Sequence, residues 1–126
     1  MQALPEERVR RQLVDWLIGE VGVPARLLAV EYPLSALDPR CRKRADVVVW
    51  RPAETGGGLT PWLLAECKAP GVKLGEEVTD QVRGYAARIR AEYVLVTNGA
   101  DTRIFRLTQK AYEALGGMPP YPDPAA

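Results

Sequence analysis

Two apolar runs, joined by a loop rich in glycine and proline, most constrain the fold of this 126-residue chain. The first run, ADVVVW at 45–50, is short and rich in β-branched residues. The second, WLLAECK at 62–68, is apolar almost to its end. Such runs are typical of buried strands, and the intervening segment RPAETGGGLTP is typical of a connecting loop. We therefore predict two neighbouring antiparallel strands within a sheet.

The other segments predict helices on either side of this pair in the chain. Residues 5–21 repeat apolar side chains at helical spacing, with Pro5 in the first turn and Gly22 just beyond the end. The segment 76–91 has the same periodicity. We expect further strands at 27–33, 93–98 and 102–107, the last at a sheet edge, and a short helix within 108–117.

This order of elements predicts an α/β (α+β) fold with a mixed central sheet flanked by helices. Short connections make the first three strands an antiparallel meander, and the helix at 76–91 permits a right-handed crossover to a parallel fourth strand. No linker or repeat divides the chain. We expect one domain over residues 1–117 and a loosely held, proline-rich tail over 118–126.

The amino-acid composition limits which catalytic mechanisms and metal sites the chain can have. The chain has no histidine and two cysteines, Cys41 and Cys67. These counts exclude Ser-His-Asp and Cys-His catalysis and argue against a disulfide scaffold or a four-ligand zinc site. The net charge of +1 gives no global signal for nucleic acid. No apolar run is long enough to span a bilayer, and the N-terminus does not resemble a secretory signal, so we expect a cytoplasmic protein without membrane partners.

Polar residues at the ends of the two central strands predict a metal site. Glu66 and Lys68 are two residues apart on a strand and share one face, while Cys67 points to the other. In a hairpin, Asp46 at the start of one strand lies near Glu66 at the end of the next. Two adjacent carboxylates favour a cation, and Mg²⁺ prefers such oxygen ligands, to which the Cys67 carbonyl adds one more. The alternative is that Glu66 and Lys68 form an exposed ion pair and that Asp46 is a turn residue.

The helix at 76–91 supplies two further candidates. Gln81 and Tyr85 lie four residues apart on a face that we expect to pack toward the sheet with Val78 and Val82. A glutamine on such a face needs a hydrogen-bond partner. The alternative interpretation is a boundary residue that bonds a nearby backbone group.

Together these motifs resemble a known family. RAD at 44–46, AECKAP at 65–70, Gln81-x-x-x-Tyr85 and VLVTNG at 94–99 resemble the PD-(D/E)xK nuclease superfamily, and more narrowly the N-terminal nuclease domain of type I restriction enzyme R subunits. The resemblance runs from about Glu6 to Phe105. It implies an αβββαβ restriction-endonuclease-like core and Mg²⁺-dependent hydrolysis of DNA phosphodiesters, with Mn²⁺ as an alternative ion.

The resemblance also implies roles for individual residues. Asp46 and Glu66 would hold the metal, and Lys68 would position or activate the attacking water. Gln81 and Tyr85 would match an accessory motif near the site and the DNA. A carboxylate from the first helix often completes such sites, for which Glu7 is the first candidate and Glu31, on the first strand, the second.

Basic residues before Asp46 are candidates for DNA contact. Because they precede a metal ligand, they are placed to meet phosphates, although a solvated loop is the alternative. We expect DNA contacts from Arg40, Arg42, Lys43, Arg44 and Lys73, with little base specificity. The sequence has no G-x-x-x-x-G-K-[ST] motif, so translocation is not expected of it. Separately encoded restriction or helicase subunits and a second copy of the chain are candidate partners, and a catalytically inactive binding module is the alternative function.

Overall fold

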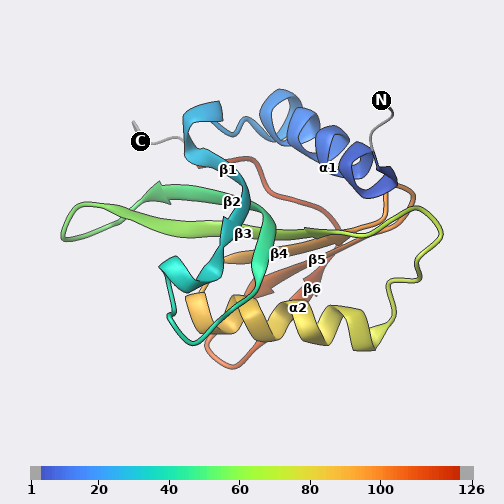
Figure 1. Cartoon of the computed structure of the whole chain (residues 1–126). Helices are drawn as coiled ribbons and strands as arrows, with labels where there is room; N and C mark the ends of the chain where they lie inside the picture. The colour runs from blue at the N-terminus through green and yellow to red at the C-terminus, as the bar shows by residue number, and fades with distance from the viewer. Residues whose placement is uncertain (1–3, 123–126) are drawn as a thin grey trace.

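The structure is a computed structural model that describes residues 4–122. Within these residues the fold consists of two α-helices, three short 3-10 or π-helical turns and six strands, in an order that confirms the predicted α/β class with a mixed sheet. The elements are α1 (Pro5–Trp16), β1 (Leu28–Pro33), β2 (Arg44–Pro52), β3 (Leu59–Cys67), α2 (Glu76–Ile89), β4 (Tyr93–Thr97), β5 (Thr102–Leu107) and β6 (Tyr112–Leu115). Figure 1 shows α1 on one face of the sheet and α2 on the other.

The sheet follows the predicted topology over its first five strands. The strands lie in the order β1-β2-β3-β4-β5-β6. Strands β1, β2 and β3 form the expected antiparallel meander, and α2 provides the crossover to β4, which is parallel to β3. Strand β3 therefore lies inside the sheet, and its last residues, Glu66 and Cys67, pair with β4 beyond the point where pairing with β2 ends.

Both faces of the central strands are covered. On β2, Val47 and Val49 belong to the core beneath α1, whereas Val48 belongs to the core beneath α2. Strand β3 alternates in the same way, with Leu63 and Leu64 on opposite faces. A strand buried on both faces reads as a continuous apolar run rather than an alternating one. This double burial explains why the two central runs were easy to identify.

Helix α1 packs through the predicted apolar stripe. Val9 and Leu13 are buried, and the chain continues through Leu17 and Val21 as a short π-helical turn over residues Leu17–Val21. Gly22 closes this turn with φ of 87°, a left-handed conformation that favours glycine. Neither α1 nor α2, the two α-helices of the described chain, has the length and apolar character needed to cross a bilayer.

The predicted short helix within 108–117 is wrong, because these residues contain β6. AYEAL has good helix formers, but it is too short to outweigh pairing with β5 along the open sheet edge. Tyr112 fixes this pairing by donating a hydrogen bond of 2.5 Å from its hydroxyl to the buried Ala91 carbonyl. The prediction that β5 lies at an edge is wrong for the same reason, since β6 covers it.

The segment after β6 is packed rather than loosely held up to residue 122. Tyr121 is buried, its ring lies edge-on to Trp62 with centroids 5.0 Å apart, and its hydroxyl donates to the Trp50 carbonyl at 2.8 Å. The expectation of a loose tail is therefore wrong for residues 118–122, because an amphipathic tyrosine anchors them. Residues 123–126 lie outside the described part of the chain.

Candidate functional site

Asp46 and Glu66 come together where β2 begins and β3 ends. Regular pairing of the two strands starts at Val47 and Ala65, so Asp46 lies just beyond the ladder. Its Oδ2 accepts a hydrogen bond of 2.7 Å from the Cys67 backbone amide. The Asp46 carboxylate thus satisfies a backbone donor that strand pairing leaves open, which fixes the carboxylate beside the end of β3.

The surroundings of Glu66 disfavour the ionised form of its carboxyl group beside the Asp46 carboxylate. Burial and the nearby Asp46 carboxylate, through charge repulsion and a side-chain hydrogen bond, together raise the pKa of Glu66 to about 8. The Lys68 ammonium opposes this shift. Without a cation, the Glu66 carboxyl therefore retains its proton at neutral pH, as expected for two carboxyl groups held together.

Lys68 is positioned by the backbone on its β4 side. Its amide donates to the Thr97 carbonyl at 2.8 Å, which extends the parallel pairing by one residue. The buried Asn98 then ties down the following loop, because its Nδ2 donates to the Val72 carbonyl at 2.7 Å. Its Oδ1 accepts from the amides of Ala100 and Asp101. Asn98 therefore joins the β4–β5 turn to the segment that carries Lys68.

Glu31 marks an irregularity opposite Asp46. Its φ is 50°, in the left-handed region that residues other than glycine rarely adopt. Val30 pairs with Val47 and Tyr32 with Ala45, but Glu31 does not form the pair with Asp46 that this register would give. Strained residues of this kind cluster at functional sites. Here the strain frees Asp46 from the β1 ladder. Glu31 itself is exposed and pairs with Arg10 at 3.0 Å.

The charge of Glu6 on α1 also reaches the pair, which makes Glu6 a further candidate beside the predicted Glu7 and Glu31. The Glu6 charge raises the pKa of both Glu66 and the buried Cys67 thiol. Spacing could have indicated this candidate, since Glu6 lies three and seven residues before the buried Val9 and Leu13 and so shares their face.

The donor set at this site suits a hard cation. Within residues 4–122, no group of three or more His, Cys, Asp or Glu residues is arranged to hold a metal ion. The pair of Asp46 and Glu66 is nevertheless an oxygen-donor pair. Mg²⁺ is often bound by one or two carboxylates together with water and substrate phosphate. The Cys67 thiol is buried in the core beneath α1, and burial raises its pKa to about 12, which leaves it neutral.

Tyr85 packs against the core beneath α2 as predicted, but Gln81 does not. Val82 and Ile89 pack into the core, but Gln81 is exposed, because its position in the helical repeat falls at the border of the buried face. The prediction that it faces the sheet is wrong. Gln81 and Tyr85 line a basin of about 520 Å³ with the basic loop 40–43. No hydrogen bond in the described chain joins them to Asp46, Glu66 or Lys68.

The predicted DNA-contacting residues have varied surroundings. Arg40 pairs with Asp38 at 3.4 Å, and Arg44 donates to the Glu31 carbonyl at 3.3 Å. Lys43 lies over the Tyr85 ring, with Nζ 5.9 Å from its centroid. Lys73 is exposed in the loop that follows β3. Three of these predicted residues, Arg40, Arg42 and Lys43, line the basin.

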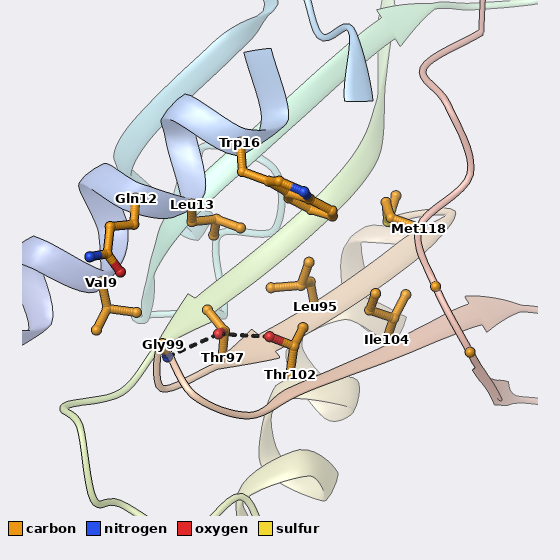
Figure 2. A pocket seen from close by; sticks show the side chains of 12 residues that line it. Val9, Gln12, Leu13, Trp16, Leu95, Thr97, Gly99, Thr102, Ile104 and Met118 are labelled. Carbon is orange, nitrogen blue, oxygen red and sulfur yellow. Dashed lines mark hydrogen bonds between the residues drawn. The ribbon is translucent and has the colours of Figure 1, made fainter. Parts of the chain in front are cut away.

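A separate cavity of about 400 Å³ lies on the α1 side of the sheet. Figure 2 shows Trp16 extending from α1 into this cavity, with Leu95, Ile104 and Met118 on other walls. Its polar residues include Thr97, whose hydroxyl bonds Thr102 and accepts from the Gly99 amide. No residue of the described lining is ionisable, so this cavity offers no acid, base or metal ligand.

Comparison with known families agrees with this geometry. The sequence profile described as Type I restriction enzyme R protein N terminus matches residues 5–119. The chain belongs to this family. Among curated protein sequences, none matches the chain significantly.

Membership confirms the resemblance drawn from the motifs. The matched range includes both helices, all six strands and the Asp46–Glu66 pair. The protein is thus a restriction-related, nuclease-like domain of the R-protein N-terminal type. The range that the family profile matches extends beyond Phe105, where the motif resemblance ended. It includes β6 and the first residues of the segment that packs against the core.

Proposed function

We propose that this R-protein N-terminal domain is a Mg²⁺-dependent DNA endonuclease. The observation that carries the proposal is the juxtaposition of Asp46 and Glu66 with the Lys68 ammonium close enough to influence Glu66. A half-buried carboxylate pair is costly without a compensating cation, which gives this arrangement a reason to exist at a metal site. Mn²⁺ is expected to substitute for Mg²⁺.

The residues of the site have different proposed roles in hydrolysis. Asp46 and Glu66 would hold the ion, and the Cys67 carbonyl is a third oxygen at the end of the same strand. A bound Mg²⁺ stabilises negative charge on a phosphodiester and lowers the pKa of bound water. The Lys68 ammonium orients the attacking water and offsets charge that develops on the phosphate. One P–O ester bond is exchanged for a P–OH bond, and the leaving oxygen takes up a proton.

The proposal includes the partners of the domain. DNA is the substrate, with phosphate contacts from Arg42, Lys43, Arg44 and Lys73 around the site. Family membership implies association with other restriction subunits, which we propose to be separately encoded. One site cuts one strand, so two copies acting together would cut a duplex. We expect these events to take place in the cytoplasm.

A cleavage assay tests the proposal. Purified protein is incubated with supercoiled plasmid and with single-stranded DNA, in Mg²⁺, Mn²⁺ or EDTA, beside Asp46→Ala and Lys68→Ala. Metal-dependent nicking that both variants lose is the expected result. Cleavage that survives in either variant would refute the assigned site. DNA binding without cleavage in any metal would instead favour an inactive binding module of the same fold.

A further inference from the structure

The basin between loop 40–43 and helix α2 has the size and lining of a ligand site. Its volume of about 520 Å³ lies within the range of roughly 300–1,000 Å³ typical of small-molecule sites. The residues that α2 contributes include Gln81, Gly84, Tyr85 and Arg88, which lie on one helix face because they are spaced by three and four residues. Figure 1 shows the loop before β2 running beside α2.

Positive charges outnumber negative ones in the basin lining, which holds Arg40, Arg42, Lys43 and Arg88 against Asp80. Its two nearby carboxylates are already engaged, since Asp38 pairs with Arg40 and Asp80 pairs with Arg83. None of the ion pairs among residues 4–122 includes Arg42, Lys43 or Arg88. These three cations therefore present donors to solvent around one hollow. Such a group favours a phosphate as its ligand.

The wall between the charges suits a planar base. A Cβ built at Gly84 meets no atom within 4 Å, so the absence of a side chain leaves open space at the centre of the α2 wall. Tyr85 offers part of an aromatic ring, and the exposed Gln81 offers a carboxamide that can both donate and accept. An aromatic ring stacks on any base, whereas an amide can bond a base edge only where the base is not already paired.

We infer that this basin binds one unpaired nucleotide of a DNA strand, with the base beside Gly84 and Tyr85 and the phosphate on Arg42, Lys43 and Arg88. The inference rests on the proposed function in taking DNA as the ligand. It adds a preference for single-stranded or locally opened DNA, and it assigns Arg88 and Gly84 to DNA binding. A duplex would reach the cations but could not insert a stacked, paired base.

Gly84 permits a test that separates lost binding from lost folding. Its φ is not in the left-handed range, and methionine is a better helix former than glycine, so Gly84→Met should fill the basin without destabilising α2. Ala87→Met is the matched control, because Ala87 is exposed on α2 and does not line the basin. Arg88→Ala tests the phosphate contact, with the exposed Lys110 giving the control variant Lys110→Ala.

Binding is measured by fluorescence anisotropy in EDTA with a single-stranded oligonucleotide, its duplex and an abasic strand of equal length. We expect Gly84→Met to weaken single-strand binding about tenfold, the size of one lost stacking contact, and to leave duplex and abasic binding unchanged. Arg88→Ala should reduce the slope of log K against log salt by about 0.7. Ala87→Met and Lys110→Ala should bind as the unaltered protein does.

Any of three results would overturn the inference. Two are equal binding of abasic and normal strands and full single-strand affinity in Gly84→Met. The third is displacement of the DNA strand by poly-glutamate at equal charge, which would indicate an acidic protein ligand. The proposed endonuclease activity fails separately. Base-dependent binding by a protein that cleaves nothing would refute the activity alone, whereas normal cleavage with an indifferent Gly84→Met would refute the basin alone.

Discussion

Binding of a divalent cation to this domain should depend steeply on pH, because Glu66 must lose a proton to become a ligand. Burial, with the neighbouring Asp46, raises the pKa of Glu66 to about 8. Below that pH the ion competes with the proton, so the apparent affinity falls about tenfold for each pH unit. Between pH 8 and pH 6 the apparent Kd for Mg²⁺ should rise by about 50-fold.

The raised pKa of Glu66 also makes the stability of the metal-free protein depend on pH. Glu66 has a higher pKa in the folded protein than its ordinary value of 4.5. Its contribution to the free energy of unfolding is therefore fully present below pH of about 4.5, and it is lost as the pH rises to about 8. Mg²⁺ should restore stability most strongly at the alkaline end, where the carboxylate is ionised and repelled by Asp46.

Isothermal titration calorimetry with Mg²⁺, in buffers of different ionisation enthalpy at pH 6, 7 and 8, measures both the affinity and the protons released. Nearly one proton should leave per ion bound at pH 6, and about half a proton at pH 8. Glu66→Gln is the control, since it cannot titrate and should bind the ion weakly at every pH. A Kd for the unaltered protein that is the same at pH 6 and pH 8 would refute the reasoning.

Three further predictions concern the supports of the site and are checked by urea unfolding. Asn98→Ala should lower the free energy of unfolding by about 2 kcal/mol, since it removes the three hydrogen bonds that the buried Asn98 side chain makes with the backbone of Val72, Ala100 and Asp101; an unchanged midpoint would contradict the role of Asn98 as a clamp. Glu31→Gly should be more stable than Glu31→Ala by about 1 kcal/mol, because both lose the Arg10 pair but only glycine relieves the strain of a positive φ; equal stabilities would show that no strain is stored there. Tyr112→Phe should cost about 1 kcal/mol through the lost hydroxyl bond to Ala91, and a variant as stable as the unaltered protein would argue against that bond.

The sequence predicted the sheet well where burial on two faces left a clear pattern. ADVVVW and WLLAECK are central strands with apolar neighbours on both sides, so no competing structure fits them. The same reasoning failed at β6, where four residues of good helix-forming composition pair with β5 instead. Edge pairing is a tertiary choice that depends on which strand is left open, and local propensity carries no information about it.

The carboxylate pair could be predicted because hairpin geometry relates the start of one strand to the end of the next. That rule placed Asp46 beside Glu66, and it needed only the loop and the two strands. The contribution of Glu31 could not be predicted. Its positive φ results from the way β1 leaves its ladder opposite Asp46, and a glutamate gives no sign of such a conformation.

The basin shows why Gln81 is exposed, whereas Tyr85 packs against the core beneath α2 as predicted. Gln81 and Tyr85 were assigned to the buried side of α2 because they neighbour its apolar residues along the helix. A helix face is broad, however, and its border residues are decided by whatever packs beside them. Here that neighbour is loop 40–43, whose position depends on Leu34 and Cys41 being buried against the sheet. The loop brings its exposed cations beside Gln81, Tyr85 and Arg88. The motif residues and the basic run looked like two separate signals in the sequence, but they form one surface. A DNA strand bound there would contact Lys43, which lies only three residues before Asp46 of the carboxylate pair in the chain.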